Sequence, residues 1–264
     1  MKIGFIGLGN MARAIIGGMI EKGGFAPADI CGADPVERAT KDVAAKFGIT
    51  AGTDNKAVAS QADILILAVK PQFMQGALDT IKDSIKKDCL IISIAPGKTI
   101  AYYEEAFGKD AALVRCMPNT PALVGEGCTG FCCNGNVTEE KKEAALKILS
   151  SFGKAYEVSE HLMDVVVGVS GSAPAYVFMF IEALADAAVC EGMPRNLAYS
   201  FAAQAVMGSA SLMLQTGKHP GELKDMVCSP GGTTIEAVKV LEENAFRGTV
   251  MDAVEACVEK SRNL

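Results

Sequence analysis

The stretch KIGFIGLGNMARAIIGGMIEKG, Lys2–Gly23, decides the fold of the first half of the chain. A short apolar run leads into Gly7-x-Gly9-x-x-Ala12, and apolar residues at helical spacing follow. Gly7 permits a tight turn, Gly9 lets the backbone approach a pyrophosphate, and Ala12 lets the helix pack closely on the strand. The spacing therefore predicts a strand–turn–helix unit that binds a dinucleotide.

Strand and helix signals alternate beyond this unit. The apolar runs are KIGFIG, DICGAD, DILILAVK, CLIISIA and ALVRCM, with CTGFCC and KAYEVS as later strand segments. Several runs are apolar throughout, which is typical of strands covered on both faces, and the alternation indicates βαβ units with a parallel sheet. After His161 the pattern is helical only. The sequence predicts an α/β fold with a Rossmann-like dinucleotide-binding domain over residues 1–160 and an all-helical domain over residues 161–264.

Composition narrows the class of protein. The chain has 264 residues, of which 50% are hydrophobic and 21% charged, with a net charge of −6. A sizeable core is available, and a nucleic-acid partner is not expected because no basic stripe is present. The start, MKIGFIG, has no basic-then-apolar leader. Nine cysteines without a Cys-x-x-Cys pair, and only two histidines, predict reduced thiols, no metal site and a cytoplasmic location.

One segment without charge, Asn196–Gly217, is long enough to span a membrane. It consists mostly of Ala, Ser, Gly and Gln, however, and is far less hydrophobic than a Leu/Ile/Phe span. We expect a helix that other helices bury in an intertwined homo-oligomer, and no membrane association.

Asp34 ends the second predicted strand, where an acidic residue accepts hydrogen bonds from the adenosine ribose and favours NAD over NADP. An ordinary alternative is a helix start, with Asp34 as cap and Pro35 at the first helical position. Arg38, about one turn later, is able to meet a ribose phosphate. The sequence therefore leaves both NADH and NADPH open.

The stretch CSPGGTTIEAVKVLEE, Cys228–Glu243, places two glycines and two threonines before an apolar helical stripe. Ser and Thr are common helix caps, and Pro-Gly is a common turn. Bare glycine amides at a helix N-terminus also form an anion site for a carboxylate or phosphate. Both interpretations stay open on this stretch alone.

Longer blocks carry a family resemblance. They are AVKP (Ala68–Pro71), MPNTPALV (Met117–Val124), VSGSAPAYVF (Val169–Phe178) and HPGELKDMVCSPGGTTIEAV (His219–Val238). With the glycine motif they occur in the order found in pyrroline-5-carboxylate reductases, which the chain resembles over nearly its whole length. The resemblance implies reduction of the cyclic imine 1-pyrroline-5-carboxylate to L-proline by NADPH or NADH, the last step of proline biosynthesis. It also implies that the helical domain is a dimerisation domain, in a homodimer or a larger ring of dimers.

The resemblance also implies functional residues. The cofactor would contact Ile6, Gly7, Leu8, Gly9, Asn10, Met11, Asp34, Asn55, Ala68, Val69, Lys70, Pro71, Ser93, Ala95 and Asn119. The substrate would lie on the loop residues Ser229, Gly231, Gly232, Thr233 and Thr234. The N–H groups of Gly232, Thr233 and Thr234 would take the carboxylate. The Thr234 hydroxyl would orient the ring nitrogen as the catalytic group, so that catalysis rests on alignment and charge placement.

Pro96 and Lys98 depart from the family pattern, because Pro96 removes a backbone donor near the expected nicotinamide. The rival enzyme classes are a β-hydroxyacid dehydrogenase and another imine reductase. The former needs a lysine base on the first long helix of the second domain, and Pro174–Glu191 contains none. A non-catalytic dinucleotide sensor is the rival outside enzymes. Lys70 is a further candidate acid, although strand-end lysines are more often solvated.

Overall fold

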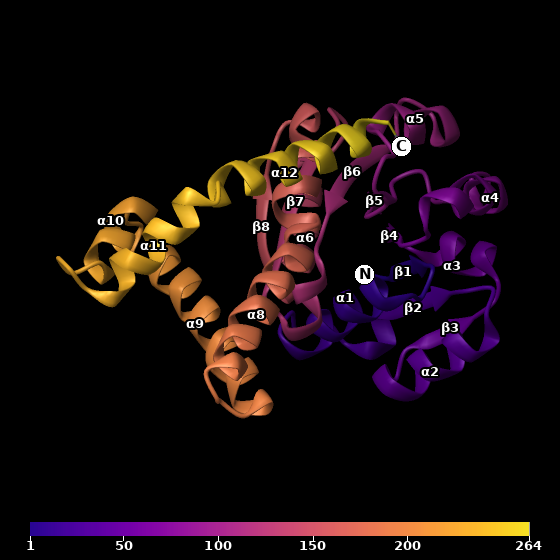
Figure 1. Ribbon diagram of the computed structural model, residues 1–264. Coiled ribbons are helices and arrows are strands. Elements are labelled where there is room, and N and C mark those ends of the chain that lie inside the picture. Colours follow the sequence, from indigo (N-terminus) through magenta and orange to yellow (C-terminus); the bar gives the residue numbers. More distant parts are fainter. Residues whose placement is uncertain (264) are drawn as a thin grey trace. The chain divides into compact units, whose positions relative to one another are not determined.

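The computed structural model describes residues 1–263, which form two compact units (Figure 1). The first unit is Met1–Ser172 together with the end of the chain from Cys257, and the second is Ala173–Ala256. The first unit thus continues past residue 160, the domain boundary predicted from the sequence. Two contacts hold this continuation in place: Met163 is buried against the sheet, and the Asn119 side chain donates to the Ser170 carbonyl.

An eight-stranded sheet forms the centre of the first unit, in the order β3-β2-β1-β4-β5-β6-β7-β8. The strands are β1 Ile3–Ile6, β2 Ile30–Ala33, β3 Thr50–Gly52, β4 Ile64–Leu67, β5 Leu90–Ser93, β6 Ala112–Met117, β7 Gly127–Cys133 and β8 Gly153–Glu157. All seven strand segments named from the sequence are confirmed. β3 was not predicted, because its three residues contain no apolar run.

The sheet is parallel from β3 to β6, but β7 pairs antiparallel with β6. The connection between β6 and β7 runs over 118–126 and contains only a short 3₁₀ turn, Thr120–Val124. So short a connection cannot make the crossover that parallel strands require. The predicted parallel sheet is therefore confirmed for the strands that carry the glycine motif, and β7 is the antiparallel exception at this edge.

Helices cover both faces of the sheet. They are α1 Asn10–Glu21, α2 Glu37–Phe47, α3 Asn55–Gln61, α4 Pro71–Ile81, α5 Ile100–Phe107, α6 Glu139–Leu149 and the short α7 Met163–Val166. Helices α1, α2 and α6 bury apolar residues on one face, and α3, α4 and α5 on the other. The strand order reverses at β1, which lies between β2 and β4. The carboxyl ends of β1 and β4 therefore form the topological switch point at which such sheets bind ligands.

The second unit is helical, as predicted for the end of the chain. It contains α8 Ala173–Cys190, α9 Arg195–Thr216, α10 Pro220–Val227 and α11 Thr233–Glu243, and α12 Phe246–Arg262 begins in it. A π-helical turn, Val167–Gly171, precedes α8 in the first unit. Helices α8 and α9 pack through the small residues Ala185, Ala198 and Ala202, so their backbones lie close together.

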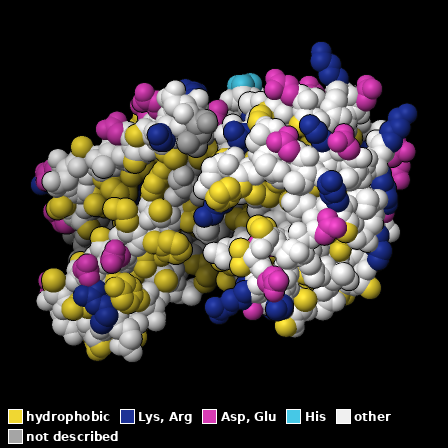
Figure 2. All heavy atoms as spheres, turned by 90° about the vertical axis from the view of Figure 1, so that its right-hand side faces the viewer, with side chains coloured by type: hydrophobic (Ala, Val, Ile, Leu, Met, Phe, Trp, Pro, Cys, Tyr) yellow, Lys and Arg dark blue, Asp and Glu magenta, His cyan; other side chains and the backbone are white. Residues whose placement is uncertain are grey.

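Many large apolar side chains of the helical unit are exposed in the single chain. Examples are Phe178, Phe201, Met207 and Leu214. Figure 2 shows hydrophobic side chains gathered in part of the face that it draws, with charged side chains over the rest. Two helical segments are long and apolar enough to cross a membrane by length and composition, Glu160–Cys190 and Arg195–Thr216. An apolar surface of this extent is typical of a contact with another protein or a membrane.

Candidate active site

The glycine loop after β1 has the geometry that a dinucleotide needs. Gly7 has φ +93°, and a Cβ there would lie 2.7 Å from the Ala68 carbonyl oxygen, so only glycine fits. Gly9 is the opposite case, because a Cβ on it would have no atom of residues 1–263 within 4 Å. The loop therefore packs tightly against β4 at Gly7 and leaves open space in front of Gly9.

Helix α1 starts at this open space. Gly9 is its N-cap, and no side chain of the described residues caps the helix. The N–H groups of a first helical turn, here those of Asn10 and Met11, have no partner within the helix, and the helix dipole favours an anion there. Together with the space at Gly9, these donors fit the pyrophosphate of a dinucleotide.

A pocket of about 430 Å³ continues from this loop along the carboxyl ends of β1, β2 and β4. Eight predicted cofactor residues line it: Ile6, Gly7, Gly9, Asp34, Asn55, Ala68, Val69 and Lys70. Six lining residues were not predicted: Pro35, Val36, Thr53, Phe73, Gly76 and Ala77. The spacing of Phe73, Gly76 and Ala77 places them on one face of α4, and Phe73 is 62% exposed, so an exposed aromatic at this helix face was the available signal.

Asp34 joins the end of β2 to the glycine loop. Its Oδ2 accepts the Leu8 N–H at 2.8 Å, and its Oδ1 accepts the Val36 N–H at 2.9 Å. Helix α2 begins at Glu37 with Val36 as N-cap, so the alternative of Asp34 as cap and Pro35 as first helical residue is wrong. The carboxylate lines the pocket instead.

Several predicted cofactor residues have partners inside the protein. The Leu8 side chain is fully buried, and the backbone N–H of Leu8 donates to the Asp34 carboxylate. Ser93 is 2% exposed, and its hydroxyl bonds to Tyr103 and accepts the Ala95 N–H. Burial raises the pKa of Tyr103 to about 12 and keeps the phenol neutral. The Ser93 side chain thus holds the loop after β5 together.

Lys98, which departs from the family pattern, also has a local partner. Its ammonium lies 4.8 Å from the centre of the Tyr102 ring, within cation–π range.

Pro71 is the first residue of α4 and Lys70 is the N-cap of that helix, in extended backbone geometry. This is a standard arrangement, since the proline gives up an N–H that a first turn does not use.

Asn119 is 8% exposed, and its side-chain amide is used at both ends. It accepts the Cys128 N–H at 2.8 Å and donates to the Ser170 carbonyl at 3.0 Å. These bonds tie the loop after β6 to β7 and to the π-helical turn. The structure therefore gives Asn119 a positioning role, and a direct contact with the cofactor stays a prediction.

The loop before α11 does not support the capping interpretation, and anion binding there stays a prediction. Gly231 has φ +67°, and the Gly232 N–H donates to the Ser229 carbonyl at 3.0 Å. Helix α11 begins at Thr233, and within the described chain no side chain caps it. The Ser and Thr hydroxyls are therefore not helix caps, and the first-turn N–H groups of Thr233 and Thr234 remain available. The expected Gly232 donor is the exception, because its N–H is already used.

Other side chains capable of acid–base chemistry have ordinary structural roles. His219 caps α10, accepting the Gly221 N–H on Nδ1 at 3.1 Å. Glu182 and Asp186 are exposed, and Asp186 pairs with Arg195. All nine cysteines, which lie in the described part of the chain, are free thiols, and residues 1–263 contain no group of three His, Cys, Asp or Glu that is able to hold a metal ion.

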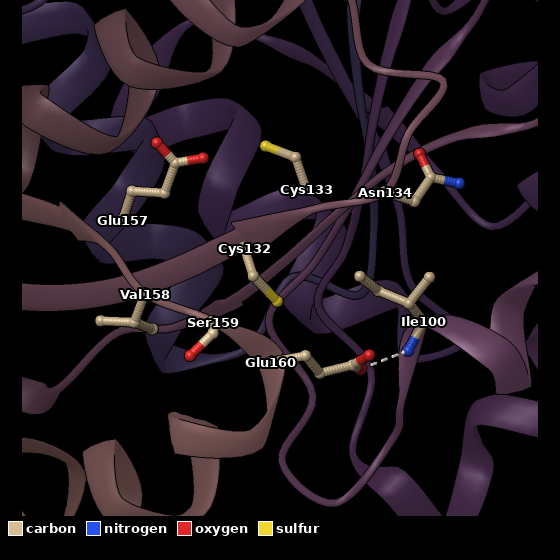
Figure 3. A pocket seen from close by; sticks show the side chains of 8 residues that line it. All are labelled: Ile100, Cys132, Cys133, Asn134, Glu157, Val158, Ser159 and Glu160. Atoms are coloured by element: carbon tan, nitrogen blue, oxygen red, sulfur yellow. Dashed lines mark hydrogen bonds between the residues drawn. The ribbon is translucent and has the colours of Figure 1, made fainter.

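A second pocket, of about 630 Å³, lies beside β7 and β8 (Figure 3). Figure 3 shows Glu160 reaching toward the Ile100 backbone, with the Cys132 thiol beside it. Glu160 Oε1 accepts the Ile100 N–H at 2.7 Å and pairs with Arg115 at 3.1 Å. Burial raises the pKa of Cys132 to about 11, so this thiol is protonated and unreactive. We regard these groups as structural, and none of the predicted site residues lines this pocket.

Comparisons with known proteins show what the chain is similar to. The family described as "Pyrroline-5-carboxylate reductase dimerisation" matches residues 160–264, and the one described as "NADP oxidoreductase coenzyme F420-dependent" matches residues 2–97. The pyrroline-5-carboxylate reductase of Escherichia coli is 53% identical over 263 residues, covering 100% of this chain and 98% of the relative.

Two solved structures share the fold over its full length. A pyrroline-5-carboxylate reductase from Coxiella burnetii has a TM-score of 0.92 and 37% identity, covering 99% of this chain and 97% of that one. A Plasmodium falciparum pyrroline carboxylate reductase with NADP bound has a TM-score of 0.90 and 36% identity, covering 100% and 97%.

Proposed function

The chain belongs to the pyrroline-5-carboxylate reductase family, and from this premise we propose how its own residues perform the reaction. It is an NAD(P)H-dependent oxidoreductase that reduces 1-pyrroline-5-carboxylate to L-proline. When bound, the nicotinamide cofactor supplies the hydride. Asn10 and Met11, with the pocket residues from Ile6 to Ala77, hold the dinucleotide.

The substrate carboxylate binds at the N-terminus of α11. The observation that carries this assignment is the uncapped first turn of α11, which follows a Ser-Pro-Gly-Gly turn held by the Gly232–Ser229 hydrogen bond. The N–H groups of Thr233 and Thr234 bind one carboxylate without a cation, because the helix dipole adds to their partial charge. The Ser229 hydroxyl is the third donor.

The Thr234 hydroxyl positions the ring nitrogen. A cyclic imine is basic enough to arrive protonated, so its N–H⁺ donates to the Thr234 oxygen and the imine carbon keeps its electrophilic character. The chain then needs no dedicated acid, and catalysis rests on orientation and fixed dipoles. Lys70 is exposed at the start of α4, where a solvated lysine fits better than a proton donor.

Thr234→Val tests this role, since valine keeps the shape and removes the hydroxyl. We expect kcat/KM for 1-pyrroline-5-carboxylate to fall about 10- to 150-fold, the effect of losing one hydrogen bond to a charged group. The control is Thr249→Val, the same change at an exposed position of α12. Unchanged turnover in Thr234→Val, with proline still formed, would contradict the assignment.

Homo-oligomerisation follows from the dimerisation match over residues 160–264. We propose a homodimer or a larger ring of dimers in which a second copy covers the exposed apolar side chains of α8 and α9, so that neither helix enters a membrane. The low charge of these helices and the small residues between them support this arrangement. We also propose a cytoplasmic location, supported by nine free thiols, which fit a reducing compartment.

A further inference from the structure

We infer that Asp34 makes this chain select NADH over NADPH. The inference rests on the proposed dinucleotide site and concerns the ribose end of the cofactor. Asp34 lines the pocket together with Pro35 and Val36, immediately after β2. In a doubly wound fold this position meets the adenosine ribose, which carries a 2′-hydroxyl in NADH and a 2′-phosphate in NADPH.

The acceptor sites that remain on Asp34 favour the ribose 2′-hydroxyl of NADH over the 2′-phosphate of NADPH. Each Asp34 carboxylate oxygen already accepts one backbone N–H, from Leu8 at 2.8 Å and from Val36 at 2.9 Å. A carboxylate oxygen has two acceptor sites, so each oxygen keeps one for a further donor. A ribose diol offers two O–H donors, whereas a phosphate dianion offers only acceptors and a like charge. The two backbone bonds also fix the carboxylate in place, so it cannot easily turn away from a phosphate.

Three cations lie on the neighbouring helices α1 and α2, and each is directed to a partner other than the pocket. The Arg38 guanidinium extends into solvent, with its side chain 91% exposed, and lies 4.0 Å from Asp42. Lys41 pairs with Glu37 at 3.2 Å. Arg13 donates to the Leu8 carbonyl at 3.1 Å and also lies within 3.8 Å of Asp42. None of these three cations lines the pocket. The one cation that does line it within residues 1–263 is Lys70, which follows β4, and β1 lies between β4 and the end of β2 that carries Asp34. The Asp34 end of the pocket therefore has no lining cation to hold a 2′-phosphate.

The comparisons with known proteins name NADP, the opposite cofactor to the one we infer. One matching family is described as an NADP oxidoreductase, and the Plasmodium falciparum structure has NADP bound. If this chain simply followed those names, it would prefer NADPH. The prediction of NADH preference therefore depends on its own residues from Asp34 to Asp42.

The experiment is a titration of the purified full-length protein with NADH and NADPH, followed by cofactor fluorescence without any imine. We expect the wild-type protein to bind NADH at least about tenfold more tightly, in line with one unfavourable charge contact. Asp34→Ser should lower that ratio at least about tenfold. Glu37→Gln is the matched control: it also removes one negative charge and it frees Lys41, but neither residue lines the pocket, so the ratio should change less than about twofold.

The outcomes separate this inference from the reductase assignment. Selective NADH binding without turnover of 1-pyrroline-5-carboxylate would contradict the reductase assignment and still support the inference on cofactor selection. Equal or tighter binding of NADPH to the wild type would overturn the inference, even with full reductase activity. If Asp34→Ser weakened the binding of NADH and NADPH equally, with an unchanged melting temperature, Asp34 would only hold the Leu8 loop in place. That result would also overturn the inference. Failure of the folded protein to bind either cofactor would overturn the site itself.

Discussion

Two glycines in the dinucleotide loop have opposite requirements. Gly7 must be glycine for the protein, because its φ of +93° and the Ala68 oxygen exclude a side chain. Gly9 must be glycine for the ligand, because its φ of −72° suits any residue and the space before it is open. The glycine motif predicted both positions, but the structure shows why each is there.

This difference gives a pair of variants with separate effects. Gly9→Val should leave the melting temperature nearly unchanged and weaken cofactor binding by about a hundredfold or more, because the side chain fills the space for the pyrophosphate. Gly7→Ala should instead destabilise the fold by at least about 1 kcal/mol, since alanine is strained at positive φ and clashes with β4. Thermal melts and cofactor titrations of both variants check this. Tight cofactor binding by Gly9→Val would contradict the assigned pyrophosphate site.

At the scale of elements, Glu160 connects three parts of the first unit. It lies in a 3₁₀ turn after β8 and accepts the first N–H of α5 (Figure 3). It also pairs with Arg115 in the middle of β6. The Arg115 side chain is only 7% exposed, so it depends on this partner, while Glu160 is 37% exposed. The bond network therefore ties α5 and the turn after β8 to β6, with β7 lying between β6 and β8 in the sheet.

Glu160→Ala should destabilise the protein more than an exposed ion pair would. The change leaves the Arg115 charge buried and the Ile100 N–H without its acceptor, and we expect a loss of about 2–3 kcal/mol in urea unfolding, discounted for the exposure of Glu160. The double variant Arg115→Met/Glu160→Leu should recover most of that loss, because it removes both charges. A single variant as stable as wild type would show that the pair contributes nothing.

Elements with a strong local pattern were predictable, and those set by distant contacts were not. β1, β4 and β5 are continuous apolar runs, and their existence follows from the sequence. The direction of β7 depends on how short its connection to β6 is, and β3 has only Thr-Ala-Gly to mark it. The roles of Leu8 and Asn119 were missed for a related reason, since their hydrogen-bond partners lie 26 and 51 residues away.

At the scale of the whole molecule, buried titratable groups limit stability at high pH. Burial raises the pKa of the Cys89 thiol to about 12 from its ordinary 9.0, and that of the Tyr103 phenol to about 12 from 10.0. In the unfolded chain both groups lose their protons at lower pH, so their contribution is complete below pH 9 and is lost as the pH rises toward 12.

Unfolding free energy should therefore fall between pH 9 and 12, by at most about 1.4 kcal/mol per pH unit for each group. Cys89→Ala/Tyr103→Phe should show a flatter pH profile in urea unfolding, even if it is less stable at pH 7. A profile as steep as that of the wild type would place the alkaline sensitivity elsewhere.

We propose above all that the uncapped N-terminus of α11 holds the carboxylate of a cyclic imine. The most direct measurement compares kcat/KM for 1-pyrroline-5-carboxylate and for 1-pyrroline, which has the same ring without the carboxylate, at saturating NADH. Two or more hydrogen bonds to a charged group are lost with the carboxylate, so we predict that 1-pyrroline is used at least about a hundredfold less efficiently. Equal efficiency with both imines would contradict the account.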